Sequence, residues 1–116
     1  MKREVRDYIN DIADAIAEIG DFTRGMDFAA FAADKKTTNA VIRSLEVLGE
    51  AANHISPEIA TAHPAIPWKQ MRAMRNKLSH EYFGVDLEIV WAVVSEELPP
   101  LKPHIEQLRQ KGQTPP

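Results

Sequence analysis

Apolar residues recur every three or four positions along almost the whole chain, and this spacing constrains the fold more than any other feature. The first such stripe begins at Val5 and predicts a helix. Phe22 prolongs it toward Gly25, which we expect to be its C-terminal stop rather than Gly20. The stripe contains Val5, Tyr8, Ile9, Ile12, Ala15, Ile16 and Ile19.

A second stripe predicts a long helix from about Thr38 to Ile55. Its apolar members are Val41 or Ile42, Leu45, Leu48, Ala52 and Ile55. Between the two long helices, Asp27 can start one or two short turns within MDFAAFAADKK. No segment shows a credible strand-like alternation of apolar and polar residues, so the periodicity is helical throughout.

Proline and N-cap residues mark where the later helices begin. Ser56 precedes Pro57 and Glu58, a combination that predicts a short helix ending before the pair at 63–64. Pro67 can start the next helix in the same way. The buried side of that helix is expected to carry Trp68, Met71, Met74 and Leu78.

Asp86 can cap a last helix after the break expected at Gly84. Pro99 and Pro100 should kink or interrupt this helix, because neither has an amide proton to donate. Together these patterns predict an all-α fold, an up-and-down bundle of four to five helices. We expect one domain over residues 1–110 and a flexible C-terminal tail over 111–116.

Composition excludes several classes of protein. The chain has 116 residues, of which 44% are apolar and 27% charged, so it can build one core. No apolar run approaches the roughly 20 residues that span a bilayer, and acidic residues interrupt the N-terminus, so we expect a cytoplasmic protein. Cysteine is absent, which excludes disulfides and thiolate chemistry. A formal charge of −3 argues against coating nucleic acid by bulk attraction.

The sequence offers no cofactor or metal motif. It lacks the Gly-rich phosphate loops of nucleotide-binding folds, so no cofactor is expected. A di-iron bundle needs paired Glu-x-x-His motifs. The nearest approach is Glu50 with His54, at i and i+4, and there is no second copy. We therefore expect no metal site.

The most distinctive segment is RNKLSHEYFGVD, which begins at Arg75 and places His80 five residues later. Positions five apart on a helix project about 140° apart. The two side chains therefore converge only if the helix ends between them or if counterparts come from a second subunit. The simpler alternative is that Arg75 pairs with a neighbouring carboxylate and His80 caps the helix.

The chemistry available to this pair is metal-free cleavage of RNA. That reaction uses the ribose 2′-hydroxyl and needs a base, an acid and a cation for the phosphorane. His80 could move the protons, Arg75 could clamp the phosphate with two hydrogen bonds, and Asn76 could add a neutral donor. Around them, residues 59–80 carry four positive charges and no acid, the other three being Lys69, Arg72 and Lys77. These three are candidates for guiding the RNA strand, although a charge run is often only a solvated helix face.

Four segments in order carry a resemblance. They are VIRSLEVLGEAANHIS, AIPWKQM, RNKLSHEYFGVD and VDLEIVWAVVSEELPPL, and together they resemble HEPN-domain proteins of the HepT type, from Arg3 to about Leu108. The resemblance implies a helical homodimer in which both Arg-x4-His segments face one cleft, with metal-independent ribonuclease activity. It also implies that Arg75 and His80 are the catalytic pair and Asn76 an accessory group.

The same resemblance implies the toxin half of a type VII-like toxin–antitoxin pair. The partner would be a minimal nucleotidyltransferase of the MNT type that transfers AMP to the tyrosine of the Arg-x4-His-x-Tyr motif, here Tyr82. On its own, Tyr82 could equally be a half-buried aromatic that closes the helix end against Phe83.

Two points remain open at this level. A non-catalytic module could use the same bundle to dock a nucleotidyltransferase and present a nucleotide or substrate to it. Glu50 lies in a segment of small and apolar residues and could pair with Arg43, His54 or a motif arginine, so we assign it no catalytic role.

Overall fold

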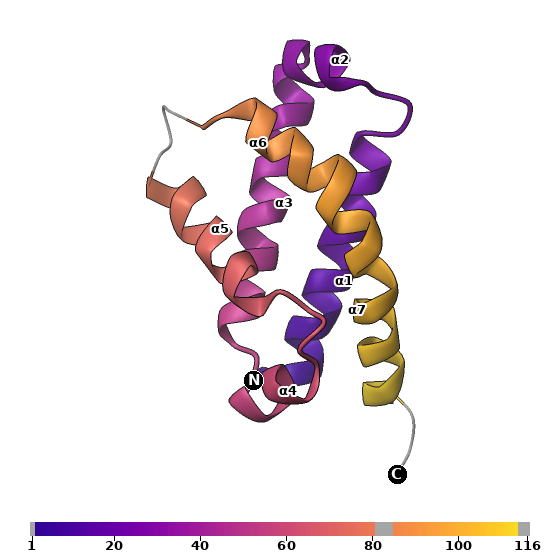
Figure 1. Cartoon of the computed structure of the whole chain (residues 1–116), viewed down its shortest axis with the longest axis vertical. Helices are drawn as coiled ribbons and strands as arrows, with labels where there is room; N and C mark the ends of the chain where they lie inside the picture. Colours follow the sequence, from indigo (N-terminus) through magenta and orange to yellow (C-terminus); the bar gives the residue numbers. More distant parts are fainter. Residues whose placement is uncertain (1, 81–84, 114–116) are drawn as a thin grey trace.

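The structure, a computed structural model, describes residues 2–80 and 85–113; at positions 77, 79, 80, 112 and 113 it describes the backbone only. Two long helices, α1 (Val5–Phe22) and α3 (Lys35–Asn53), run side by side along the 47 Å axis of the molecule (Figure 1). The short helix α2 (Phe28–Ala33) joins them at one end. This pair is the centre of the bundle.

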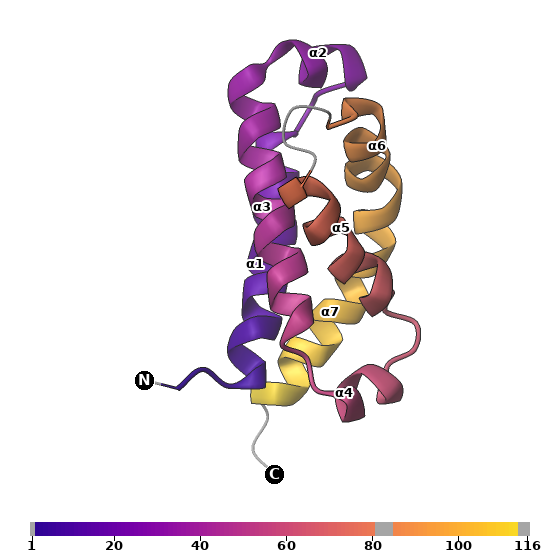
Figure 2. The same cartoon turned by 90° about the vertical axis from the view of Figure 1, so that its left-hand side faces the viewer.

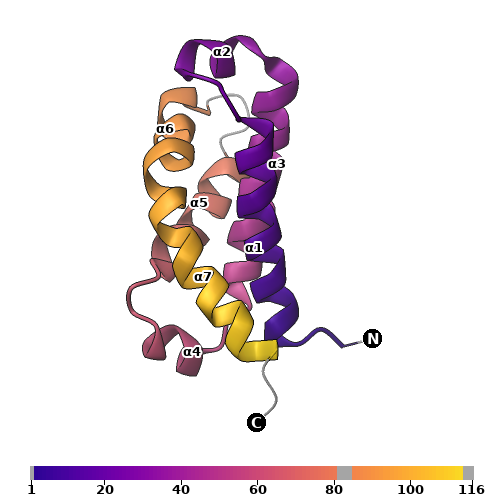
Figure 3. The same ribbon diagram turned by 90° about the vertical axis from the view of Figure 1, so that its right-hand side faces the viewer.

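The second half of the chain packs on both sides of that pair. α4 (Pro57–Ala62) leads into α5 (Trp68–His80), which lies against α3 (Figure 2). α6 (Leu87–Ala92), the π-helical turn η1 (Val93–Glu97) and α7 (Leu98–Gln113) follow one another, and α7 packs against α1 (Figure 3). The described residues thus form an all-helical bundle, which confirms the expected fold class.

Capping side chains begin these helices largely where the sequence predicts them. The Asp27 carboxylate accepts a hydrogen bond from the Ala30 N–H at 2.8 Å and starts α2. Ser56 caps α4 by accepting from the Ile59 N–H, and Asp86 caps α6 by accepting from the Glu88 N–H at 2.9 Å. Each cap satisfies a backbone donor that has no partner within its helix.

Three helix limits differ from the prediction, one in α1 and both in α3, which ends at Asn53 and not at Ile55. α1 ends at Phe22 instead of reaching Gly25, because the Thr23 hydroxyl and N–H both donate to the Ile19 carbonyl and close the last turn. Gly25 instead adopts a φ of 77° in the following turn, a conformation that glycine adopts without strain.

The second difference is that α3 begins at Lys35, three residues before the predicted start, because Asp34 caps it. The Asp34 carboxylate accepts from the Thr37 N–H at 3.1 Å and from the Thr37 hydroxyl at 2.9 Å. The Thr37 backbone N–H, and then its hydroxyl, hold the pKa of the Asp34 carboxyl below its usual range.

The prolines near residue 100 coincide with a change in helix type rather than with a loop. At the end of η1 the Leu98 N–H bonds to the Val93 carbonyl, five residues earlier. The wider turn lies directly before Pro99 and Pro100, which have no N–H to donate. The helix then continues through α7 to Gln113; residues 114–116 of the predicted tail lie outside the described residues.

The core lies between α1, α3 and the α6–α7 segment. Ile12, Phe31, Val41 and Leu45 have no exposed surface, and Ile19 and Ile105 have almost none. Among the helices within residues 2–80 and 85–113, none combines the length and apolar character needed to cross a membrane.

Candidate functional site

Close packing of α5 on α3 fixes the position of Arg75. At their contact α3 presents Gly49, which is buried. A Cβ atom added to Gly49 would lie 2.3 Å from the Arg75 Cβ and 2.9 Å from the Met71 carbonyl oxygen. Only a residue without a side chain fits between these helices, so the start of the Arg75 side chain is held directly against the backbone of α3.

Two partners orient the guanidinium of Arg75. Its Nε lies 3.0 Å from Oε2 of Glu50, and its Nη1 donates to the Oδ1 of Asn76 at 3.1 Å. The Arg75 side chain is 38% exposed, so the guanidinium is held and still reachable from solvent. The alternative in which Arg75 pairs with a neighbouring carboxylate is therefore observed, with Glu50 as the partner, and the Asn76 side chain accepts a hydrogen bond from Arg75.

Glu50 is the centre of a wider set of contacts. Its second oxygen, Oε1, lies 3.3 Å from Nε2 of His54. The His54 ring stacks on Tyr8 with centroids 4.4 Å apart and planes 9° apart, and the Arg3 guanidinium carbon lies 4.7 Å above the Tyr8 ring. The contacts thus run from the N-terminal segment through α1 and α3 to Arg75.

Four of these residues, Arg3, Tyr8, Glu50 and Arg75, line a cavity of about 290 Å³ between α1, α3 and α5. Three ion pairs lie around it: Arg3 with Asp11 at 2.7 Å, Arg43 with Glu46 at 3.6 Å, and Arg75 with Glu50 at 3.0 Å. Its lining is completed by Tyr8, Val47 and Ala51. Such a cavity offers guanidinium groups to the anionic part of a ligand. Its carboxylates and its apolar floor can contact a polar ring of the same ligand.

The remaining predicted residues lie along α5 or beyond it. Lys69 is exposed, and Arg72 is half-buried with its Nε donating to the Trp68 carbonyl at 3.2 Å. Lys77 is described by its backbone alone, and Tyr82 lies outside the described residues. The roles predicted for these four residues stay predictions.

His80 is the last residue of α5, and the helix is unbroken from Arg75 to that point. The possibility that α5 ends between the two residues is therefore wrong. Hydrogen bonding along α5 continues through the polar sequence of the motif, and positions 75 and 80 stay about 140° apart around one axis. Two arrangements could bring Arg75 and His80 together, and the one that remains uses counterparts from a second subunit.

Sequence reasoning missed two features of this site. Arg43, Glu46, Glu50 and His54 follow the spacing i, i+3, i+7, i+11 and so share one face of α3, a signal that was present in the sequence. Gly49 offered only the general signal of a glycine inside a helical pattern. In the part of the chain that the structure describes, no three His, Asp or Glu side chains form a group able to hold a metal ion.

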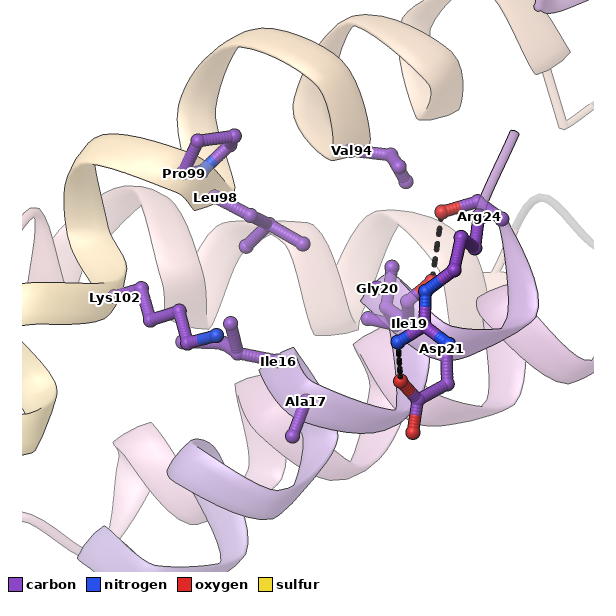
Figure 4. Close-up of a pocket in the computed structure, with 11 residues that line it drawn as sticks. Ile16, Ala17, Ile19, Gly20, Asp21, Arg24, Val94, Leu98, Pro99 and Lys102 are labelled. Carbon is purple, nitrogen blue, oxygen red and sulfur yellow. Dashed lines mark hydrogen bonds and ion pairs between the residues drawn. The ribbon is translucent and has the colours of Figure 1, made fainter. Parts of the chain in front are cut away.

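A second cavity, of about 350 Å³, lies between α1 and the η1–α7 junction (Figure 4). Its walls are largely apolar, with Ile16, Ile19, Val94 and Leu98, and Arg24 at its rim is tied to Asp21 at 2.6 Å. Among the side chains that the structure describes, none from α5 lines it, and Lys69, Arg72, Arg75 and Asn76 do not belong to it.

Comparisons with known proteins converge on one family. A family model described as Ribonuclease HepT-like matches residues 12–108. A protein of Thermococcus cleftensis named "Probable ribonuclease HepT" is 50% identical over 110 residues, which cover 95% of this chain and all of that protein. A Methanocaldococcus jannaschii protein named as a "Putative RNase" is 43% identical over 107 residues, covering 92% of this chain and 88% of the relative. No solved structure gives a significant match.

Proposed function

The chain belongs to the HepT-like ribonuclease family, and on that premise we propose that it cleaves RNA without a metal ion, using Arg75 and His80. The observation that carries the proposal is the fixed position of Arg75. Its Cβ lies against Gly49, Glu50 and Asn76 hold its guanidinium, and the side chain stays partly open to solvent at the rim of a cavity. An arginine held in this way is prepared to bind a phosphate.

The reaction follows from the chemistry of these groups. The 2′-hydroxyl of the RNA attacks the neighbouring phosphorus, and the bond to the 5′-oxygen of the next nucleotide breaks. His80 serves proton transfer, since imidazole can give and take a proton near neutral pH. Arg75 stabilises the charge that develops on the phosphorane oxygens. Asn76 supports Arg75 by accepting a hydrogen bond from its Nη1.

A homodimer would complete the site. Because α5 is unbroken between positions 75 and 80, one chain directs these positions about 140° apart around the helix axis. Two-fold symmetry would bring the arginine of one subunit toward the histidine of the other and would provide two of each group in one cleft. The cleft and its second subunit are part of the proposal.

The same proposal includes control by a partner. The protein acts as the toxin of a toxin–antitoxin pair, and a nucleotidyltransferase antitoxin of the MNT type transfers AMP to Tyr82. An adenylyl group adds a negative phosphate and a purine two residues from His80, and both would oppose RNA binding at a cationic cleft.

The direct test is cleavage of a labelled single-stranded RNA in EDTA by wild type, His80→Ala and the matched variant His104→Ala. His104 is an exposed residue of α7, so its substitution changes the same residue type outside the proposed site. We expect His80→Ala to lower the rate by about 10² to 10⁴-fold and His104→Ala to leave it unchanged. Equal cleavage by His80→Ala and wild type would contradict catalysis at His80, and no cleavage by wild type would favour the non-catalytic binding module instead.

A further inference from the structure

We propose that the 290 Å³ cavity beside Arg75 is the site that holds the single-stranded RNA substrate, with the strand running along α3 from Arg43 to Arg75. This inference rests on the proposed ribonuclease function. In this arrangement the main contacts with the RNA strand come from a groove between α1, α3 and α5 and not from the outer face of α5.

The geometry of α3 gives the groove its direction. Arg43, Glu46, Val47, Glu50 and Ala51 follow the spacing i, i+3, i+4, i+7, i+8, so they form one continuous face of the helix. Seven residues separate Arg43 from Glu50, which corresponds to about 10 Å along the axis. Since Arg75 contacts Glu50, one cation lies at each end of this stretch. α1 supplies the opposite wall with Tyr8 and Asp11.

The charges around the groove are balanced, because Arg3, Arg43 and Arg75 pair with Asp11, Glu46 and Glu50, so binding of a phosphate depends on which arginine can take a new partner. Guanidinium groups arrive from the N-terminal segment, from α3 and from α5, through Arg3, Arg43 and Arg75. The loosest of the three ion pairs is Arg43–Glu46 at 3.6 Å, and its arginine side chain is 75% exposed. A contact this long contributes little by itself, and the Arg43 guanidinium, which contacts Glu46 through Nη1, has further N–H groups that can donate charge-assisted hydrogen bonds to a phosphate.

The floor between these cations suits the sugar and base of one nucleotide. Val47 is half-buried and Ala51 buried, and both present apolar surface to the cavity. The Tyr8 ring stacks on His54 and also carries the Arg3 guanidinium over it, so it contributes a wall and not a free stacking surface. A base in this groove therefore packs on Val47 and on the planes of the arginines, which is a common mode of single-strand recognition.

The second cavity contains an arginine that can serve as a control for Arg43. Arg24 lines it as Arg43 lines the first, with 79% of its side chain exposed and an i,i−3 carboxylate partner in Asp21. Arg43 has 75% exposure and an i,i+3 partner in Glu46. The two arginines have equal charge and nearly equal exposure, but only Arg43 lies in the cavity that contains Arg75.

The experiment measures binding of an uncleavable 2′-fluoro RNA 12-mer of mixed sequence by fluorescence anisotropy, for wild type, Arg43→Gln and Arg24→Gln. We expect Arg43→Gln to weaken binding about ten-fold, the effect of losing one charge-assisted contact, and Arg24→Gln to change it less than two-fold. In a salt titration, Arg43→Gln should also reduce the slope of log K against log salt by about 0.7. Equal weakening by both variants would show attraction by net charge and would overturn the proposal.

A second measurement reports the place of binding directly. Methyl NMR spectra contain the signals of Val47 in the groove and of Val94 in the other cavity. Titration with the same RNA should shift the Val47 methyl signals and leave those of Val94 in place; the opposite result would overturn the proposal. If wild type cleaves RNA but Arg43→Gln binds normally, this inference fails and the proposed function stands. If wild type neither binds nor cleaves RNA, both fail.

Discussion

Replacement of Gly49 by alanine tests whether the contact between α3 and α5 sets the geometry of the site. The added Cβ would lie 2.3 Å from the Arg75 Cβ, whereas ordinary contact begins at 3.4 Å. The Arg75 Cβ and the Met71 carbonyl are not flexible side-chain ends, so neither can turn away. The substitution therefore has to move α5 away from α3 by about 1 Å near Arg75.

Two opposing effects determine the stability of Gly49→Ala. Overpacking of this size costs about 1 to 3 kcal/mol, while alanine is favoured over glycine inside a helix by about 1 kcal/mol. The net loss should be about 1 kcal/mol, or a few degrees in melting temperature. The loss of activity should be larger, because a shift of about 1 Å in a positioned group can lower a rate by about 10²-fold.

Gly20→Ala is the matched control, because Gly20 also lies inside a long helix and no atom lies within 4 Å of its added Cβ. It should gain up to about 1 kcal/mol in stability and keep wild-type cleavage. Melting temperatures by circular dichroism, and cleavage rates measured well below them, separate the two effects. Wild-type cleavage by Gly49→Ala would refute the argument, as would an equal loss of activity in Gly20→Ala.

Three further predictions concern the charge, the modification and the assembly of the site. Glu50→Ala should lower the cleavage rate at saturating RNA about ten-fold. The free energy of unfolding should change by no more than about 1 kcal/mol, because the ion pair with Arg75 is about half exposed. A change in KM alone would argue against a positioning role for Glu50. On incubation with the nucleotidyltransferase partner, ATP and Mg²⁺, wild type should gain about 329 Da per AMP and Tyr82→Phe none, and labelling of the phenylalanine variant to the same extent would remove Tyr82 from the mechanism. Light scattering at micromolar concentration should give twice the chain mass of 13.0 kDa, and a monomer there would contradict the composite cleft.

Most of the fold could be predicted because it depends on local signals. The apolar stripes of α1 and α3 and the caps Ser56 and Asp86 act within a few residues of themselves, and sequence reasoning found these helices, although the end of α1 and the limits of α3 differ from the prediction. The start of α3 was missed because Asp34 is followed by two lysines and two threonines, which carry no apolar period. Its cap is visible only once the Thr37 N–H is seen to donate to the Asp34 carboxylate.

The site could be predicted only in part, because its key contacts join separate helices. The residue types of Arg75 and His80 indicated metal-free cleavage of RNA, but the sequence left three possible partners for Glu50. Glu50 contacts two of them, His54 and Arg75, and the contact with Arg75 depends on Gly49, which lets α5 approach α3 until the guanidinium reaches the carboxylate. A contact across 25 residues of chain follows from packing, and no local rule in the sequence specifies it.

The contact at Gly49 has a larger consequence if two chains share one cleft. α5 packs chiefly against α3, so the separation of these two helices fixes where each subunit carries its motif. In a two-fold dimer, a displacement of about 1 Å in each subunit changes the distance between the two motifs by up to about 2 Å. That exceeds the tolerance of a positioned phosphate contact, which is why we expect Gly49→Ala to reduce cleavage far more than it reduces stability.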